Sequence, residues 1–174
     1  MRRYGIWFGV SIVAGLMMSA AVARAADEEK DKKISPKNVP QRVMHSVNGR
    51  FPHAEITGVE KENENGGIVY DFELKQNGRK YEMDIKEDGT ITEIEKEVKA
   101  KDVPAVTRAV KAKYPEAAIK EVMEVNVVTG KKEKPDHYEV TIGTGGKSKE
   151  VVVSLDGKSV KEEAEEKSEE NPKQ

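Results

Sequence analysis

The chain of 174 residues contains no cysteine, which excludes disulfide bonds, thiolate metal sites and cysteine nucleophiles. Aromatic residues make up only 5% of the sequence, and the single tryptophan, Trp7, lies near the amino terminus. Charge is abundant instead, with 30 lysines and arginines against 32 aspartates and glutamates. A chain without a basic excess has no general attraction for nucleic acid or an anionic membrane, so we expect neither as a partner.

Histidine is also scarce, and His45, His53 and His137 show no spacing that would bring metal ligands together. We interpret all three as surface residues. No serine stands in a recognisable relation to a histidine, as a nucleophilic triad requires. We therefore predict no metal, no cofactor and no catalytic residue, and an enzyme is the least favoured of the function classes.

One short segment imitates a phosphate-binding loop. Residues 143–148 read GTGGKS, but Thr141 occupies the place of the first glycine of that motif. The segment also joins two predicted strands instead of opening a helix. A hairpin turn is therefore the better interpretation.

The first 25 residues have the layout of a secretory signal peptide. Arg2 and Arg3 precede an uncharged, mostly apolar stretch over residues 4–23, and small side chains follow. The residues expected at the cleavage site are Ala23, Ala25 and Ala26. We predict an exported protein, periplasmic or secreted. An uncleaved anchor is the alternative, because about 20 apolar residues suffice to span a bilayer.

Cleavage would remove three of the 30 basic residues and none of the 32 acidic ones, which leaves a mature chain with a net charge near −5. Both ends of this mature chain are charged and poor in apolar residues. We predict a flexible charged linker over residues 26–35 and a disordered acidic tail over residues 164–174. Neither segment can bury enough apolar surface to offset the entropy of ordering it.

The chain contains a tandem repeat of a segment of roughly 65 residues. The first copy begins at Val39 and its helical stretch ends before Pro52; the second begins at Val103 and its helical stretch ends before Pro115. Further along, an offset of 68 aligns Tyr70 with Tyr138, Phe72 with Val140, Leu74 with Ile142, Met83 with Val151, Ile85 with Val153, and Asp88-Gly89 with Asp156-Gly157. Such self-similarity sets the architecture.

Each copy begins with an amphipathic helix. We expect Asn38 to cap the first helix and Asp102 the second, with the following Val-Pro in the first turn. Apolar residues then recur at helical spacing and form one stripe, and a proline ends the helix. The stripes are Val39, Val43, Met44, Val47 and Phe51 in the first copy, and Val103, Val106, Val110 and Tyr114 in the second.

The remainder of each copy alternates between apolar and polar residues, which is typical of strands with one buried and one wet face. Asn77 and Gly145 begin the central hairpin turns, and Leu155 is expected to point inward. We predict an α+β fold with two tandem units, residues 36–98 and 99–163. Each unit would pack one helix on a four-stranded antiparallel meander sheet.

The order of these motifs resembles the PepSY-like family, the group also described as beta-lactamase-inhibitor-like. The resemblance rests on Val-Pro before the helix, aromatic-Pro-x-Ala after it, Tyr-x-[Phe/Val]-x-[Leu/Ile] in a strand and a closing Asp-Gly, and it extends over residues 36–163. It implies exported bacterial proteins with one helix on an antiparallel sheet, often in tandem, and a binding or inhibitory role. The family brings no catalytic residue to carry over to this chain.

The predicted wet face of the sheet is the candidate site for a partner. Its residues are Asp71, Glu73, Lys75, Glu82, Asp84, Glu139, Thr141 and Glu150. On an open, wet sheet we expect ordinary proton affinities for these carboxylates. Because the face lacks the aromatic anchors of tight protein interfaces, we expect weak or electrostatic binding rather than potent inhibition.

The sequence thus favours an exported, non-catalytic module that binds a protein or peptide of the cell envelope. Through the family resemblance, it would modulate or inhibit an exported peptidase or another envelope protein. A small-ligand or cation-binding envelope protein is the alternative, with Glu82 and Asp84 as part of a loose cation site.

Overall fold

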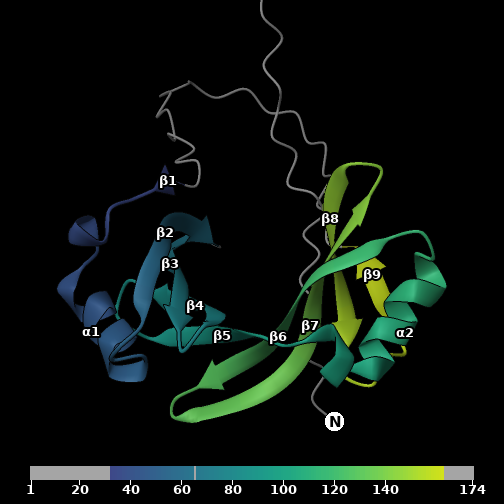
Figure 1. Cartoon of the computed structure of the whole chain (residues 1–174). Coiled ribbons are helices and arrows are strands. Elements are labelled where there is room, and N and C mark those ends of the chain that lie inside the picture. Colours follow the sequence, from purple (N-terminus) through teal and green to yellow (C-terminus); the bar gives the residue numbers. More distant parts are fainter. Residues whose placement is uncertain (1–31, 65, 163–174) are drawn as a thin grey trace, which may run out of the picture.

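The computed structural model describes residues 32–64 and 66–162 and confirms the α+β class (Figure 1). A 3-10 turn, a helix and four strands follow one another twice along the chain. The helical elements are η1 (Pro36–Asn38), α1 (Gln41–Arg50), η2 (Ala100–Asp102) and α2 (Pro104–Lys113). The strands are β1 (Lys32–Lys33), β2 (Glu55–Glu64), β3 (Gly67–Gln76), β4 (Arg79–Lys86), β5 (Ile91–Glu97), β6 (Ala118–Thr129), β7 (Lys132–Thr144), β8 (Lys147–Ser154) and β9 (Val160–Glu162). The predicted cleavage site at Ala23, Ala25 and Ala26 and the predicted tail lie outside the described residues.

These strands form one antiparallel sheet in which each strand pairs with the next along the chain, from β1 to β9. The two predicted four-stranded meanders are therefore not two sheets but parts of one sheet, a point that the sequence left open. The last strand of the first copy, β5, pairs with the first strand of the second, β6, from Glu93 opposite Val127 to Glu97 opposite Met123. The physical reason is that two sheet edges brought together by a short connection can satisfy each other's backbone groups.

Both helices start later than their predicted caps. Asn38 ends η1 and Asp102 ends η2, so neither residue is the N-cap of an α-helix. The N-cap residues are instead Pro40 and Val103, and neither helix has a side-chain capping hydrogen bond. A 3-10 hydrogen bond immediately before each helix takes the place of the expected cap.

Two hydrophobic cores lie on the same face of the sheet, one beneath each helix. The predicted stripe of α1 packs on β2–β5, where Val43, Val47 and Phe72 are at most 1% exposed. Val106 and Val110 of α2 pack on β6–β8 in the same way. Burial of these side chains supplies the main favourable term in folding, at about 25 cal/mol per Å² of apolar surface.

The second half of the chain also contributes to the first core. The hairpin of β6 and β7 extends toward α1 (Figure 1), and Val128 near its tip packs against the first core. In the same region Nη2 of Arg50, at the end of α1, lies 2.5 Å from Oε2 of Glu133 on β7. The two halves are therefore joined by side chains as well as by the β5–β6 ladder.

Several local features differ from what the sequence suggests. Leu155, expected to point inward, is 44% exposed because β8 ends at Ser154 and Leu155 lies in the turn that follows. Lys32–Lys33, expected in a flexible linker, pair with β2 as β1.

Pro135 lies inside β7 at a register shift opposite Asn126, a position at which a strand tolerates proline.

The turn after β8 lies directly against α2, and Gly157 makes the contact. Gly157 has a φ of +69°, and a Cβ at this position would lie 2.8 Å from the carbonyl oxygen of Ala105. We expect Gly157→Ala to lower the free energy of unfolding by about 2–4 kcal/mol, because left-handed strain and a backbone clash act together. Urea denaturation measures this loss.

Gly78→Ala is the matched control for that variant. Gly78 has a φ of +76°, but nothing lies within 4 Å of the place that a Cβ would occupy, so alanine there should cost only the strain, about 1–2 kcal/mol. Equal losses in the two variants would show that the turn does not press on α2.

Candidate functional site

The face of the sheet opposite the two helices, here called the open face, carries two rows of acidic side chains. Alternation along each strand places every second side chain on this face, and the cross-strand register then brings carboxyls side by side. The rows across β3, β4 and β5 are Asp71, Asp84 and Glu93, and Glu73, Glu82 and Glu95. Like charges directly opposite one another destabilise a sheet, so these rows are not explained by strand pairing.

The predicted face residues fall into two groups on this sheet. The group on β3 and β4 consists of Asp71, Glu73, Lys75, Glu82 and Asp84. The group on β7 and β8 consists of Glu139, Thr141 and Glu150, with Thr141 opposite Glu150. β5 and β6 lie between the two groups, so the structure does not make them adjacent.

Sequence reasoning missed the residues that lie between the groups. Glu93 and Glu95 on β5 continue the two acidic rows toward the second half of the sheet. The signal was present, because residues 90–98 alternate in the same way as the strands before them. Only the pairing of β5 with β6 shows that these carboxyls stand at the centre of one sheet rather than at an edge.

Burial and like charge raise the pKa of the first-row carboxyls. Burial, together with the charges of Asp84 and Glu82, raises the pKa of Asp71 to about 8. Burial and the charges of Glu93 and Glu64 raise the pKa of Asp84 to about 7. The expectation of ordinary proton affinities on this face is therefore wrong, because the side chains crowd one another out of water.

The carboxyls of β5 are perturbed in the same direction. Burial and the charge of Glu139 on β7 raise the pKa of Glu93 to about 7 and that of Glu95 to about 10. Oε2 of Glu95 and Oδ1 of Asp71 are buried and have no hydrogen-bond partner within residues 32–64 and 66–162. A buried carboxylate without a partner is costly, so these groups favour the protonated form or a bound cation.

His137 on β7 lies among these acids. Its Nδ1 is 3.1 Å from Oδ2 of Asp136, and its Nε2 is 3.2 Å from Oε1 of Glu139. The hydrogen bond with Glu139, helped by Asp136 and opposed by partial burial, raises the pKa of His137 to about 9. The imidazole is thus a cation at neutral pH, and with only 21% of its side chain exposed it is not the surface histidine expected from the sequence.

Lys80 pairs with one carboxyl of the rows and with a glutamate of β6. Its Nζ lies 2.7 Å from Oε1 of Glu82 and 3.2 Å from Oε2 of Glu121. Burial lowers the pKa of Lys80, but the hydrogen bonds and charges of these two glutamates raise it by more. In the part of the chain that the structure describes, Glu82 is the one carboxyl of the two rows that forms an ion pair. The other row carboxyls have no cationic partner there, so they carry either a proton or a negative charge that nothing balances.

An apolar strip adjoins the acids on the open face. Val125 on β6 lies between Glu95 and His137 in the cross-strand register and is fully buried. Met123 is 3% exposed, and neither residue belongs to the two cores under the helices. Both side chains lie beneath the surface of the open face and present almost no apolar area to solvent.

Two absences among the described residues bear on the kind of site. Across residues 32–64 and 66–162, no three histidine, aspartate or glutamate side chains are grouped so that they could hold a metal ion. Within the same ranges no helix has the length and hydropathy needed to span a bilayer.

The fold and the open face define a class of proteins in which two helices cover one side of an antiparallel sheet and leave the other side uncovered. The chain belongs to the family described as "Putative beta-lactamase-inhibitor-like, PepSY-like", whose model matches residues 26–93 and again residues 70–160. This confirms the resemblance drawn from the Val-Pro, aromatic-Pro and Asp-Gly motifs. No curated protein matches the chain significantly.

Solved structures of the same fold come from species of Bacteroides. One from Bacteroides eggerthii, described among "putative periplasmic proteins", is 14% identical with a TM-score of 0.52, covering 71% of this chain and 88% of its own. A DUF2874 family protein from Bacteroides uniformis is 16% identical with a TM-score of 0.52, covering 71% and 89%. A second DUF2874 family protein, from Bacteroides ovatus, is 15% identical with a TM-score of 0.51, covering 71% and 87%. At these identities the likeness concerns the fold.

Proposed function

We propose that this protein is an exported, non-catalytic binding module that captures a basic segment of another envelope protein or peptide on its open face. The single observation that carries the proposal is the pair of half-buried acidic rows on β3, β4 and β5. A cationic partner would supply the positive charge that the rows lack. Export is supported by the signal-like first 25 residues and by the periplasmic description of a protein with the same fold.

The chemistry of the face favours lysine or arginine side chains over a simple ion. Both residues have long apolar stems that pack on apolar surface while the charged head reaches a polar group. Val125 and Met123 are already covered, so such stems would lie along the half-exposed side chains around the rows instead. An extended basic segment can therefore reach the half-buried carboxyls with its charged heads.

The interface we propose is electrostatic and not anchored by aromatic residues. Tight interfaces centre on buried tryptophan, tyrosine and arginine, and the open-face rows consist of carboxyls instead. Charge complementarity of this kind accelerates association and selects partners more than it adds affinity. A modulating role toward an exported peptidase, which the family resemblance suggests, fits a reversible contact of this strength. In this view the two copies act as one binding sheet.

The test is binding of a fluorescent decalysine peptide to the mature chain. We expect the double variant Glu93→Gln/Glu95→Gln to weaken binding about tenfold, because the charge-assisted contact of Glu93 is lost and Glu95, protonated in the free chain, can no longer ionise against a cationic partner. Binding should also strengthen between pH 6 and pH 8, as carboxyls with a pKa of about 7, Asp84 and Glu93, become charged. Fluorescence anisotropy at low and high salt measures both effects.

Glu116→Gln is the matched control, since Glu116 is an exposed glutamate in the loop between α2 and β6. It removes the same kind of charge from the chain without touching the open face. If this control weakens binding as much as the double variant, attraction to the net charge alone explains the result, and the open face is not the site.

A small-cation binder is the second candidate, favoured by the unpartnered oxygens of Asp71 and Glu95. The two carboxyls lie in different rows, and the described residues contain no group of three ligands for a metal, so an organic cation suits the face better than calcium or magnesium. Thermal unfolding with calcium chloride, with magnesium chloride and with spermidine distinguishes the candidates. A melting temperature that rises by several degrees with one metal alone, and no longer rises in Asp71→Asn, would favour the metal. In a separate competition experiment, displacement of decalysine by spermidine but by neither metal would favour organic cations.

A further inference from the structure

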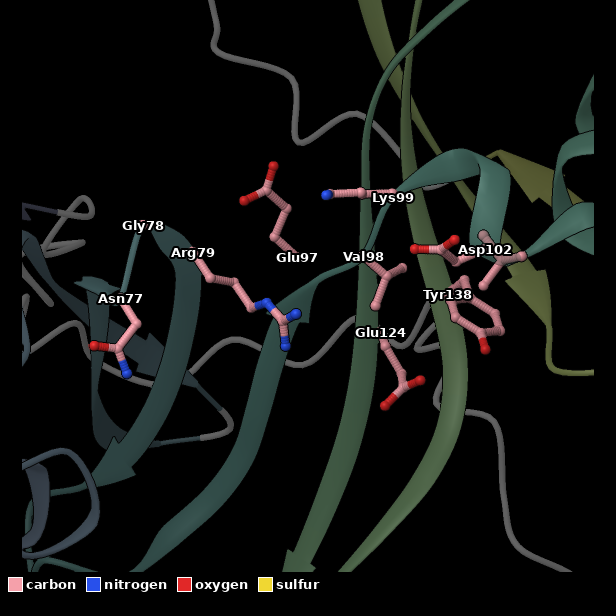
Figure 2. Close-up of a pocket in the computed structure, with 10 residues that line it drawn as sticks. Asn77, Gly78, Arg79, Glu97, Val98, Lys99, Asp102, Glu124 and Tyr138 are labelled. Atoms are coloured by element: carbon pink, nitrogen blue, oxygen red, sulfur yellow. The ribbon is translucent and has the colours of Figure 1, made fainter.

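A second hollow lies where the pairing of β4 with β5 ends. The last paired residues of these strands are Tyr81 and Lys96, and β5 then turns away into η2. The backbone N–H of Lys80 donates to Oε2 of Glu97 at 3.2 Å instead of to a strand neighbour. The gap that remains is a pocket of about 560 Å³ between the β3–β4 turn and the start of α2 (Figure 2).

The walls of this pocket come from both halves of the chain. Asn77, Gly78 and Arg79 form one wall, and Lys99 with Asp102 of the η2 connection forms another (Figure 2). Glu124 on β6 and Tyr138 on β7 are opposite one another in the sheet register and face the helix side, whereas Glu97 at the end of β5 lies on the side of the acidic rows.

The charged groups of the pocket differ in whether they have a protein partner. Glu124 is held by Nζ of Lys96 at 2.8 Å, and Glu97 by the Lys80 amide. Arg79, Lys99 and Asp102 are exposed to solvent and form no ion pair with any residue in the described ranges 32–64 and 66–162. One cation of β4 and a cation and a carboxylate of the η2 connection thus line the same hollow and are open to a ligand.

The remaining lining is apolar and aromatic. Val98 and Val103 contribute aliphatic surface, and the ring of Tyr138 stands beside Glu124 (Figure 2). Burial and the charge of Glu124 raise the pKa of the Tyr138 phenol, which therefore stays a neutral hydrogen-bonding group. The volume falls in the range of pockets that bind small organic ligands, about 300–1,000 Å³.

We propose that this pocket binds a small zwitterion, a free carboxylate next to an ammonium group, as at the ends of a short peptide. Arg79 and Lys99 hold the carboxylate, and Asp102 holds the ammonium. A small aliphatic side chain lies against Val98, Val103 and Tyr138. Charges of both signs around one hollow select a molecule that carries both signs, whereas a simple anion would be repelled by Asp102, Glu97 and Glu124.

The assignment does not depend on the proposed function, because the residues that would hold the zwitterion are not those of the acidic rows. A pocket for a peptide end would give this protein a ligand of its own in addition to a basic partner on the open face. It lies beside the only backbone connection between the two halves of the described chain, the segment through η2.

The test is titration of the isotope-labelled mature chain with trialanine, followed by amide shifts in NMR spectra. We expect saturable shifts at Gly78, Arg79, Lys99 and Tyr138. The carboxyl-terminal amide of trialanine should bind about tenfold more weakly, since a charge-assisted contact is lost. Arg79→Gln should weaken the free acid by a similar factor and leave the amide form unchanged.

Arg108→Gln, which removes an exposed arginine of α2 outside the pocket, is the control. The Glu93→Gln/Glu95→Gln variant separates this proposal from the previous one, because it should leave trialanine binding intact. Equal binding of acid and amide, shifts that fall elsewhere, or no saturable shift at millimolar trialanine would each overturn the assignment.

Discussion

The protein should be more stable at pH 5 than at pH 8, by about 3 kcal/mol or more. The carboxyls of Asp84 and Glu93 have a pKa of about 7 in the folded chain, and those of Asp71 and Glu95 have values of about 8 and about 10. Each lies above the unfolded value of roughly 4. Holding one extra proton over two pH units is equivalent to about 3 kcal/mol.

The direction follows from proton counting. Between pH 4 and the folded pKa, the folded chain keeps protons that the unfolded chain has released, so stability falls as pH rises. His137 acts in the same direction, because its pKa is raised to about 9, and the stabilisation present below its ordinary value is lost as pH rises through 9. At the acid end, Asp156 opposes further gain, since hydrogen bonds from Lys158 and Ser154 lower its pKa to about 2 and are lost as it is protonated.

Urea denaturation at pH 5, 7 and 9 checks this expectation. The variant Glu95→Gln tests whether the Glu95 carboxyl contributes to the loss of stability with pH. Glutamine resembles the protonated glutamate, so the variant should be about 1–3 kcal/mol more stable than the parent at pH 8 and should show a shallower loss with pH. Glu116→Gln should reproduce the parent profile. A stability that increases from pH 5 to pH 8 would show that the open-face carboxyls are well solvated, contrary to the structure.

Truncation of a side chain in either core should destabilise the whole sheet. Leu74 and Ile142 occupy corresponding positions beneath α1 and α2, and both are fully buried. We expect Leu74→Ala and Ile142→Ala each to lower the free energy of unfolding by about 2–5 kcal/mol, through lost transfer energy and a residual cavity. Each variant should still unfold in one transition, because β5 pairs with β6 and the Arg50–Glu133 ion pair also joins the halves.

Urea titration followed residue by residue in NMR spectra measures this cooperativity. Within each protein, the parent or either variant, peaks from β3 and from β7 should disappear together, and both variants should unfold at lower urea concentrations than the parent. Two separate transitions, with only the half that carries the alanine destabilised, would show that the halves fold as independent units despite the shared sheet.

Much of the fold could be predicted because the relevant physics is local. Alternation over residues 68–74 and 81–85 identifies strands, and the spacing of Val43, Val47 and Phe51 identifies the buried face of a helix. The repeated Asp-Gly turns locate the ends of the meander. The errors at Asn38 and Asp102 arose because a 3-10 turn competes with a helix cap for the same residues, and composition does not distinguish the two.

The candidate site was predicted only in part, for a physical reason. The sequence places Asp71 and Asp84 on a wet face, but a proton affinity depends on how many charges and how little water surround a group. Those surroundings come from Glu93 and Glu95 on β5 and from Glu139 on β7, which are distant in the chain. His137 was misjudged for the same reason.

The sequence by itself determined the duplicated helix-and-meander order, the apolar face of each element and the acidic character of the opposite face, because periods of two and of 3.6 residues are properties of neighbours along the chain. Only the tertiary structure decided that the two meanders form one sheet, that their carboxyls crowd together across β3, β4 and β5, and that a pocket opens beside η2. Those outcomes depend on contacts between residues far apart in sequence, which no local pattern records.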